Sequence, residues 1–275
     1  MSGQGFFCSA GSMPTKIIAI ANQKGGVGKT TTAINLGACL AQAGHSTLLV
    51  DLDPQGNATL GLGLGPEQLR ATLYNAMVDG VPLGEAVHAT SIPGLMLIPS
   101  QADLAAAETE LQGVEHRETI LRRGLGLIKD AYEFVLIDCP PSLGLVTLNG
   151  LAAADTVLIP VQAEFYAMSG VGLLLNTLAL VQRELNPALR VEGALLTMVD
   201  SRAALSTQVV EAMRNLFRDR VFETLVPRSV RLAEAPSHGL PISLYDPKGK
   251  GTEAYTALVA ELLRRSRAPQ APVGA

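Results

Sequence analysis

The chain contains no tryptophan, and only 4% of its 275 residues are aromatic. Charged residues make up 17% against 48% hydrophobic residues, which excludes a chain too polar to build a core. Its apolar runs are all shorter than the roughly 18 residues that a membrane-spanning helix needs. Residues 1–12 contain neither a basic segment nor a long apolar segment, so a secretory signal peptide is not indicated.

Cysteine is scarce as well: Cys8, Cys39 and Cys139 form no C-x-x-C pair, and their number is odd. This spacing argues against a disulfide framework or a zinc site and favours a reducing compartment, so we expect a cytoplasmic protein. The four histidines show no metal-ligand spacing either. The net charge of −4 excludes a generic polycation, but residues 202–250 carry eight Lys and Arg against five Asp and Glu. A local basic patch is therefore compatible with the acidic total.

Short apolar runs rich in β-branched residues alternate with longer segments of helical periodicity, which is typical of β-α-β units. We predict an α/β fold with a doubly wound, mostly parallel sheet and helices on both faces. The core domain covers residues 15–267, between a flexible tail at 1–14 and a disordered tail at 268–275. The expected strands are 16–21, 47–51, 95–99, 133–138, 156–161 and 191–198, and the expected helices lie near 29–43, 115–129, 143–153, 167–185, 203–217 and 252–265.

The strongest chemical signal is the run I-I-A-I-A-N-Q-K-G-G-V-G-K-T-T-T that begins at Ile17. An apolar strand leads into a glycine-rich turn and then a helix, so consecutive N–H groups and the helix N-terminus can surround a phosphate. Lys29 would reach the β- and γ-phosphates, and the Thr30 hydroxyl would bind Mg²⁺. The alternative is a glycine-rich turn without a ligand. The predicted nucleotide-binding residues here are Lys24, Gly25, Gly26, Val27, Gly28, Lys29, Thr30 and Thr31.

Two apolar runs end in carboxylates. Asp51 and Asp53 follow T-L-L-V, and Asp138 follows F-V-L-I. Ligands of open α/β sheets bind at this carboxyl edge, and a strand-end carboxylate there can hold Mg²⁺, often through water. For Asp51 the residues leave two roles open, support of the metal and its loop or a simple turn-capping acid.

The motif K-G-G-V-G-K-T-T departs from the common G-x-x-x-x-G-K-[ST] pattern, because Gln23 replaces the first glycine and Lys24 is added. In this form it resembles the deviant Walker A box of the ParA/MinD family of P-loop ATPases. The resemblance implies ATP and Mg²⁺ as ligands, with Lys24 crossing to the nucleotide of a second copy and closing a homodimer. It also implies that Asp53 holds the attacking water and that Asp138 is the Walker B acid, so the catalytic group is Lys24, Lys29 and Asp53.

Several later blocks, among them P-V-Q-A-E-F-Y from Pro160, L-T-M-V-D from Leu196 and V-P-R-S-V-R from Val226, resemble the chromosomal ParA branch. That resemblance implies slow ATP hydrolysis stimulated by a ParB-type partner, non-specific binding to double-stranded DNA and a nucleoid location. The residues that it assigns to adenine are Met198, Pro227 and Arg228, and those that it assigns to DNA are Arg202 and Arg231. Ser229 stands where the branch has asparagine.

Three alternatives compete with partitioning. A MinD-like ATPase that cycles on membranes needs a C-terminal amphipathic helix, whereas residues 264–275 contain two prolines, so we expect no membrane partner. An electron-transfer ATPase like the nitrogenase iron protein needs two suitably placed cysteines, and only Cys139 is near the site. A scaffold that binds nucleotide without hydrolysis is disfavoured by Asp53.

Overall fold

The computed structural model describes residues 14–164, 167–200 and 203–267. Eight strands form one sheet in the order β3-β4-β2-β5-β1-β6-β7-β8, and only β3 runs antiparallel to its neighbour. The central strands are buried along their length, which is why they appear in the sequence as continuous apolar runs. The strands are β1 (Lys16–Ile20), β2 (Thr47–Asp51), β3 (His88–Ala89), β4 (Leu95–Ile98), β5 (Phe134–Asp138), β6 (Thr156–Gln162), β7 (Arg190–Val199) and β8 (Val221–Pro227).

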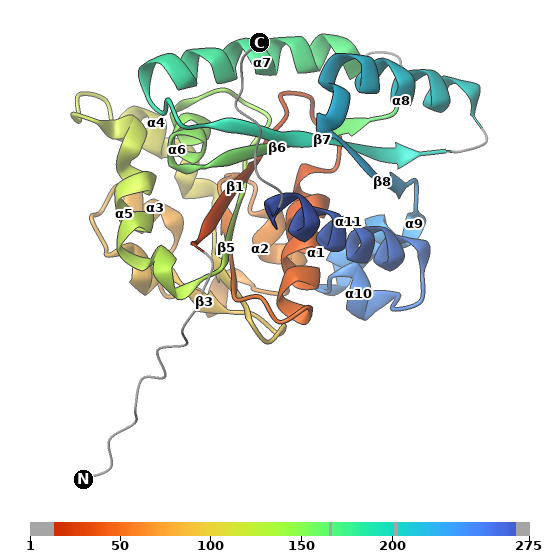
Figure 1. Ribbon diagram of the computed structural model, residues 1–275. Helices are drawn as coiled ribbons and strands as arrows, with labels where there is room; N and C mark the ends of the chain where they lie inside the picture. Colours follow the sequence, from red (N-terminus) through yellow and green to blue (C-terminus); the bar gives the residue numbers. More distant parts are fainter. Residues whose placement is uncertain (1–13, 165–166, 201–202, 268–275) are drawn as a thin grey trace.

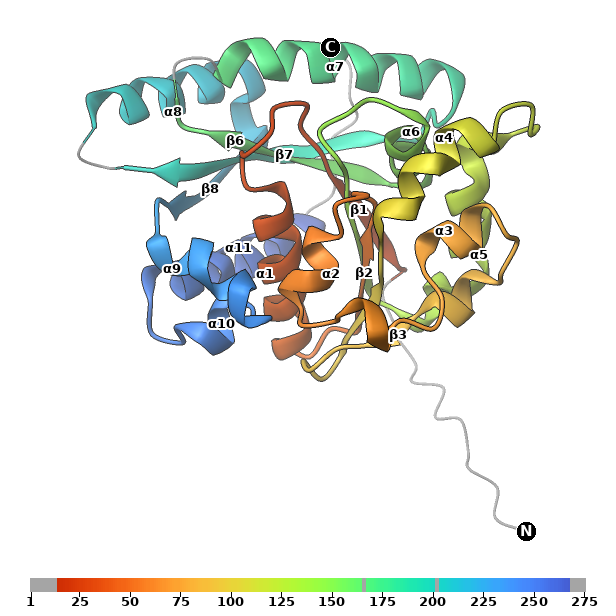
Figure 2. The same ribbon diagram turned by 180° about the vertical axis from the view of Figure 1, so that it is seen from behind.

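Helices cover both faces of this sheet (Figures 1 and 2). Side chains alternate across the strands, so Ile17 and Ala19 join one core while Ile18 and Ile20 join the other. The first core packs against α3, α5, α6, α7 and α8, and the second packs against α1, α10 and α11. The helices are α1 (Lys29–Gln42), α2 (Asn57–Gly61), α3 (Leu73–Met77), α4 (Ala107–Glu110), α5 (Ile120–Ile128), α6 (Leu145–Ala153), α7 (Ala167–Glu184), α8 (Ala204–Phe217), α9 (Val230–Glu234), α10 (Ile242–Tyr245) and α11 (Lys250–Arg267).

The parallel register brings three strand ends to one edge. Ile20 at the end of β1 pairs with Asp138 at the end of β5, and Asp138 in turn pairs with Asp51 at the end of β2. The phosphate loop and both strand-end acids therefore meet at the carboxyl edge, as the predicted fold class requires.

The six predicted strands are present, with ends that differ by one residue at most, and the predicted α/β class is confirmed. The helix expected at 115–129 is shorter and forms α5, between 3₁₀ turns at Arg117–Thr119 and Lys129–Ala131. His116 excludes the first two predicted positions, because its φ of 57° is left-handed and cannot belong to a right-handed helix. Strands β3 and β8 and five short helices were not predicted. The two tails predicted at the chain ends lie outside the described residues, apart from Pro14.

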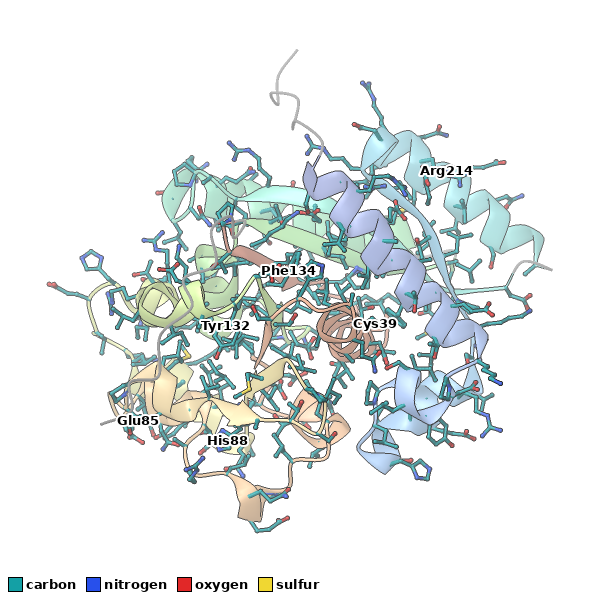
Figure 3. The ribbon with its side chains drawn as sticks, turned by 60° about the horizontal axis from the view of Figure 1, so that its bottom comes forward. Cys39, Glu85, His88, Tyr132, Phe134 and Arg214 are labelled. Carbon is teal, nitrogen blue, oxygen red and sulfur yellow. The ribbon has the colours of Figure 1, made fainter. Side chains whose placement is uncertain are left out.

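Two of the three cysteines lie within the described chain, and both are free and buried. Cys39 lies on α1 (Figure 3), where its thiol interacts with the Thr256 side chain of α11, and Cys139 follows Asp138 in the interior. Cys8 lies outside the described residues.

Candidate nucleotide and magnesium site

The phosphate loop turns sharply between β1 and α1. Gly26 (φ 72°) and Gly28 (φ 87°) both adopt left-handed backbone, which strongly favours glycine. A Cβ atom built on Gly25 or Gly26 would meet no atom within 4 Å, so the space beside them is open to a ligand. Gly28 precedes the first residue of the 14-residue helix α1, whose N-terminal N–H groups and dipole favour an anion at this point.

Lys29, the first residue of α1, is only 7% exposed, and its Nζ donates to the Lys24 carbonyl at 3.2 Å. Burial lowers the pKa of this ammonium group, while the nearby carboxylates of Asp138 and Asp53 act in the opposite direction. A buried cation between two acids is poised to accept a polyanionic ligand as an additional partner.

Asp138 is fully buried, and neither carboxylate oxygen makes a hydrogen bond of good geometry within the described residues, although the Thr30 hydroxyl lies close enough to interact with it. Burial and the neighbouring Asp51 raise the pKa of Asp138 well above its usual value, while Thr30 and Lys29 lower it only partly. An unsatisfied buried carboxylate is costly, so it fits a cation site. Together with the Thr30 hydroxyl it offers the oxygen ligands that Mg²⁺ prefers. The described part of the chain contains no cluster of three His, Cys, Asp or Glu residues suited to a metal. A magnesium site does not need one, because waters and substrate phosphates complete the coordination of Mg²⁺.

Asp51, the neighbouring strand-end acid, is also fully buried but is well satisfied. One carboxylate oxygen accepts from the Thr59 N–H at 2.9 Å and from the Thr59 hydroxyl at 2.8 Å, and the other accepts from the Asp53 N–H at 3.2 Å. Thr59 Oγ1 also accepts from the Ser100 N–H at 3.0 Å. Burial raises the pKa of Asp51 to about 6, against the effect of these hydrogen bonds. The contacts match a role in holding the loop rather than one as a free ligand.

Asp53 lies in the loop that Asp51 fixes. Its side chain accepts from the Gln55 N–H at 3.0 Å and its carbonyl accepts from the Gly56 N–H at 2.8 Å. It is half-buried, and its charge acts on Lys29. The structure thus gathers Lys29, Asp53 and Asp138 in one electrostatic cluster.

Lys24 lies at the rim of the cluster, with 33% of its side chain exposed. Its Nζ is 3.7 Å from Glu164 Oε2, and the exposed guanidinium of Arg228 lies 3.4 Å from Glu164 Oε1. Glu164 therefore pairs with two of the predicted site residues. It was missed in the sequence because 140 positions separate it from Lys24.

A small cleft of about 90 Å³ opens beside the phosphate loop. Among the residues that line it are Gly28, Thr31, Met198, Pro227 and Tyr255, so two of the three predicted adenine residues lie there with part of the loop. Arg228 is not among the lining residues, and Ser229 Oγ accepts from the Leu232 N–H at 3.4 Å to cap α9. Arg228 thus lies between two residues that line the cleft, Pro227 and Ser229, without lining it itself.

A larger cavity of about 470 Å³ lies behind the Asp53 loop. It is lined by Pro54, Gly56, Thr59, Ser100 and other residues, so its wall includes the hydrogen-bonded network that holds this loop. The sequence offered no signal for it, because its walls come from two separate segments, 54–69 and 100–103.

Of the two arginines predicted to bind DNA, Arg231 lies on α9 with 62% of its side chain exposed and pairs with Glu234 at 3.2 Å. An exposed pair of this kind contributes little, so the guanidinium remains available to a phosphate. Arg202 lies outside the described residues. Within the described chain no helix is both long and apolar enough to cross a membrane.

Comparisons with known proteins identify the family of this chain. A family model described as an AAA domain matches residues 15–191. The chain is 53% identical over 247 residues to the sporulation initiation inhibitor protein Soj of Bacillus subtilis, covering 90% of this chain and 98% of that protein. It is equally 53% identical over 257 residues to the chromosome partitioning protein ParA of Myxococcus xanthus, covering 94% and 90%.

A solved structure of cobyrinic acid a,c-diamide synthase from Mycobacterium smegmatis, with bound ADP and magnesium, shares the fold with a TM-score of 0.81. It is 39% identical and covers 92% of this chain and 96% of that one. Its name indicates a different reaction, but its identity to this chain is well below that of the two partitioning relatives. The chain belongs to the ParA/Soj family of chromosome-partitioning P-loop ATPases.

Proposed function

We propose that this chain segregates DNA by an ATP-controlled cycle. ATP and Mg²⁺ bind at the phosphate loop, two copies close into a sandwich dimer, and the dimer binds double-stranded DNA without sequence preference at the nucleoid. A ParB-type partner stimulates slow hydrolysis and returns the chain to the monomer. The observation that carries the proposal is the cluster of Lys29, Asp53 and the unsatisfied Asp138 beside an open glycine loop.

Each residue has a chemical task in this cycle. Lys29 neutralises charge on the phosphates, Thr30 and Asp138 hold Mg²⁺, with Asp138 acting through water, and Asp53 orients the attacking water. Bound Mg²⁺ would supply further neutralisation of the triphosphate. The remaining nucleotide contacts are assigned to Lys24, Gly25, Gly26, Val27, Gly28 and Thr31 at the phosphates and to Met198, Pro227 and Arg228 around the base.

Lys24 is suited to act on a second copy because its side chain is at the rim and only loosely paired. An ion pair between partly exposed groups contributes at most about 1 kcal/mol, so a triphosphate of higher charge can displace Glu164 from Lys24. A cation from each subunit then favours the closed dimer, and loss of the γ-phosphate weakens it.

Dimerisation also explains how weak basic contacts become useful. Arg231 and Arg202 would contact phosphates, which provides affinity without base readout. Two copies present twice as many contacts, so DNA affinity appears only in the ATP-bound state.

Fluorescence anisotropy of a labelled duplex tests this function. We expect binding with ATP and Mg²⁺ but neither with ADP nor without nucleotide. The logarithm of the affinity should fall with the logarithm of salt concentration by about 0.9 per phosphate neutralised. Arg231→Glu should weaken binding, whereas Arg183→Glu, at an exposed arginine on α7 outside the basic stretch, is the matched control and should not. Equal binding in all nucleotide states, or normal binding by folded Arg231→Glu at low salt, would contradict the proposal.

A further inference from the structure

Thr197 lies near the end of β7, where it lines the cleft and also contacts the phosphate loop. It is 2% exposed, and its Oγ1 donates to the carbonyl of Val27 at 2.8 Å. Val27 is 1% exposed and lies between the two left-handed glycines Gly26 and Gly28. The hydrogen bond therefore reaches the loop at its sharpest turn.

The position of Thr197 is itself firmly set. Its main chain pairs with Gln162 of β6, and its carbonyl accepts from the Ala163 N–H at 3.1 Å. Its methyl group faces the loop, because a Cβ atom built on Gly28 would lie 3.8 Å from Thr197 Cγ2. The sheet thus supplies a rigid anchor for a loop whose glycines have little intrinsic stiffness.

The next residue, Met198, connects this anchor to the cleft. Its φ of 52° is left-handed, and the register between β7 and β8 shifts between Leu196 and Val199. Irregularities of this kind re-aim side chains next to functional sites. Thr197 and Met198 both line the cleft. The Thr197 side chain also contacts the phosphate loop, so these two consecutive residues connect the loop to the cleft.

We propose that Thr197 is a positioning residue that holds the phosphate loop in its anion-binding shape against the base cleft. This inference rests on the proposed nucleotide site and deepens it. Removing the hydroxyl leaves a buried carbonyl without this donor and frees the loop to leave that shape. Base and phosphates would then no longer be held by one rigid unit.

The test uses the full chain with Thr197→Val, Thr197→Ser and a matched control, Thr156→Val. Thr156 begins the adjacent strand β6, is 5% exposed, and its hydroxyl has no hydrogen-bond partner in the described part of the chain. Its replacement therefore removes a buried threonine hydroxyl without breaking a described bond. Calorimetry measures the dissociation constants of ATP with Mg²⁺ and of inorganic tripolyphosphate, and amide hydrogen exchange follows residues 24–30.

We expect Thr197→Val to weaken binding of both ligands about tenfold and to speed exchange in residues 24–30. Thr197→Ser, which keeps the donor, and Thr156→Val should stay within about twofold of wild type. Wild-type affinity for tripolyphosphate in Thr197→Val, or an equal loss in Thr156→Val, would overturn the role of Thr197. If Thr197→Val does not fold, Thr197→Cys, which has a weaker donor of similar size, should show a smaller loss of affinity for both ligands. Wild-type affinity in Thr197→Cys would then overturn the role of Thr197. Failure of the wild-type chain to bind either ligand would instead refute the nucleotide site itself, and this inference with it.

Discussion

Asp51 and Asp138 end neighbouring strands at the same level, yet the fold treats their carboxylates differently. Asp51 receives three hydrogen bonds from Thr59 and the Asp53 N–H, whereas Asp138 receives none of good geometry within the described chain. Each additional bond to a buried carboxylate offsets part of its desolvation cost. The contacts of Asp51 therefore suit an acid that holds the Asp53 loop, whereas the oxygens of Asp138 remain open to a ligand.

Also at the scale of single residues, the two buried cysteines predict a low thiol reactivity. Burial raises the pKa of the Cys39 thiol to about 11, and burial also raises the pKa of Cys139. At pH 8 the reactive thiolate of Cys39 is about one part in a thousand, so both thiols should be inert in the native state. In a Cys8→Ser variant, a thiol-reactive chromophore should label no cysteine in native buffer and two in urea. Rapid labelling of the native variant would contradict the described burial.

At the scale of elements, the edge strand β8 is secured by α11. The carboxylate of Glu261 is almost fully buried and accepts from the N–H groups of Glu223 and Thr224 at 2.8 and 2.9 Å. It also accepts from the Thr224 hydroxyl at 2.8 Å and pairs with Arg265 at 2.7 Å. This one side chain thus satisfies backbone donors that an edge strand would otherwise present to solvent.

Glu261 predicts a pH dependence of stability. Burial by itself raises the pKa of Glu261, but these hydrogen bonds and Arg265 more than offset it and hold the pKa below its usual value. A carboxylate with a depressed folded-state pKa stabilises the protein above its unfolded pKa, and this contribution is lost as pH falls through the folded value. Glu261→Gln should therefore lower the free energy of unfolding at pH 7 by about 1–3 kcal/mol and flatten its acid-side slope.

Urea unfolding at pH 7 and between pH 3 and 5 measures this effect. Glu253→Gln, on the same helix and more exposed, serves as the control and should change little. An unchanged acid-side slope in Glu261→Gln would show that the carboxylate does not carry the contribution assigned to it.

The same elements show what could be predicted from the sequence. The strands β1, β2 and β5 and the phosphate loop carry local signals, namely long apolar runs and a fixed glycine spacing, and were found. Strand β8 was not predicted, because the polar residues Glu223 and Thr224 interrupt its apolar pattern and a distant helix satisfies their donors. Thr197 and Glu164 were missed as site residues for a related reason, because their contacts with the loop span 170 and 140 positions.

At the scale of the whole molecule, the charged cluster of Lys29, Asp53 and Asp138 lies along the carboxyl edge of the sheet, with Lys24 at its rim. Lys24 is paired with Glu164 in the single chain. In the proposed cycle it would exchange this carboxylate for the nucleotide of a second copy, so that the nucleotide state would decide the assembly state.

Size-exclusion chromatography with light scattering tests this central claim most directly. Asp53→Ala, which we expect to block hydrolysis, should form a dimer of twice the 28.8 kDa chain mass with ATP and Mg²⁺. It should return to a monomer with ADP or after chelation of Mg²⁺, and addition of Lys24→Ala to this variant should abolish the dimer. A monomer of 28.8 kDa at saturating ATP, or a dimer that persists without Lys24, would contradict the account.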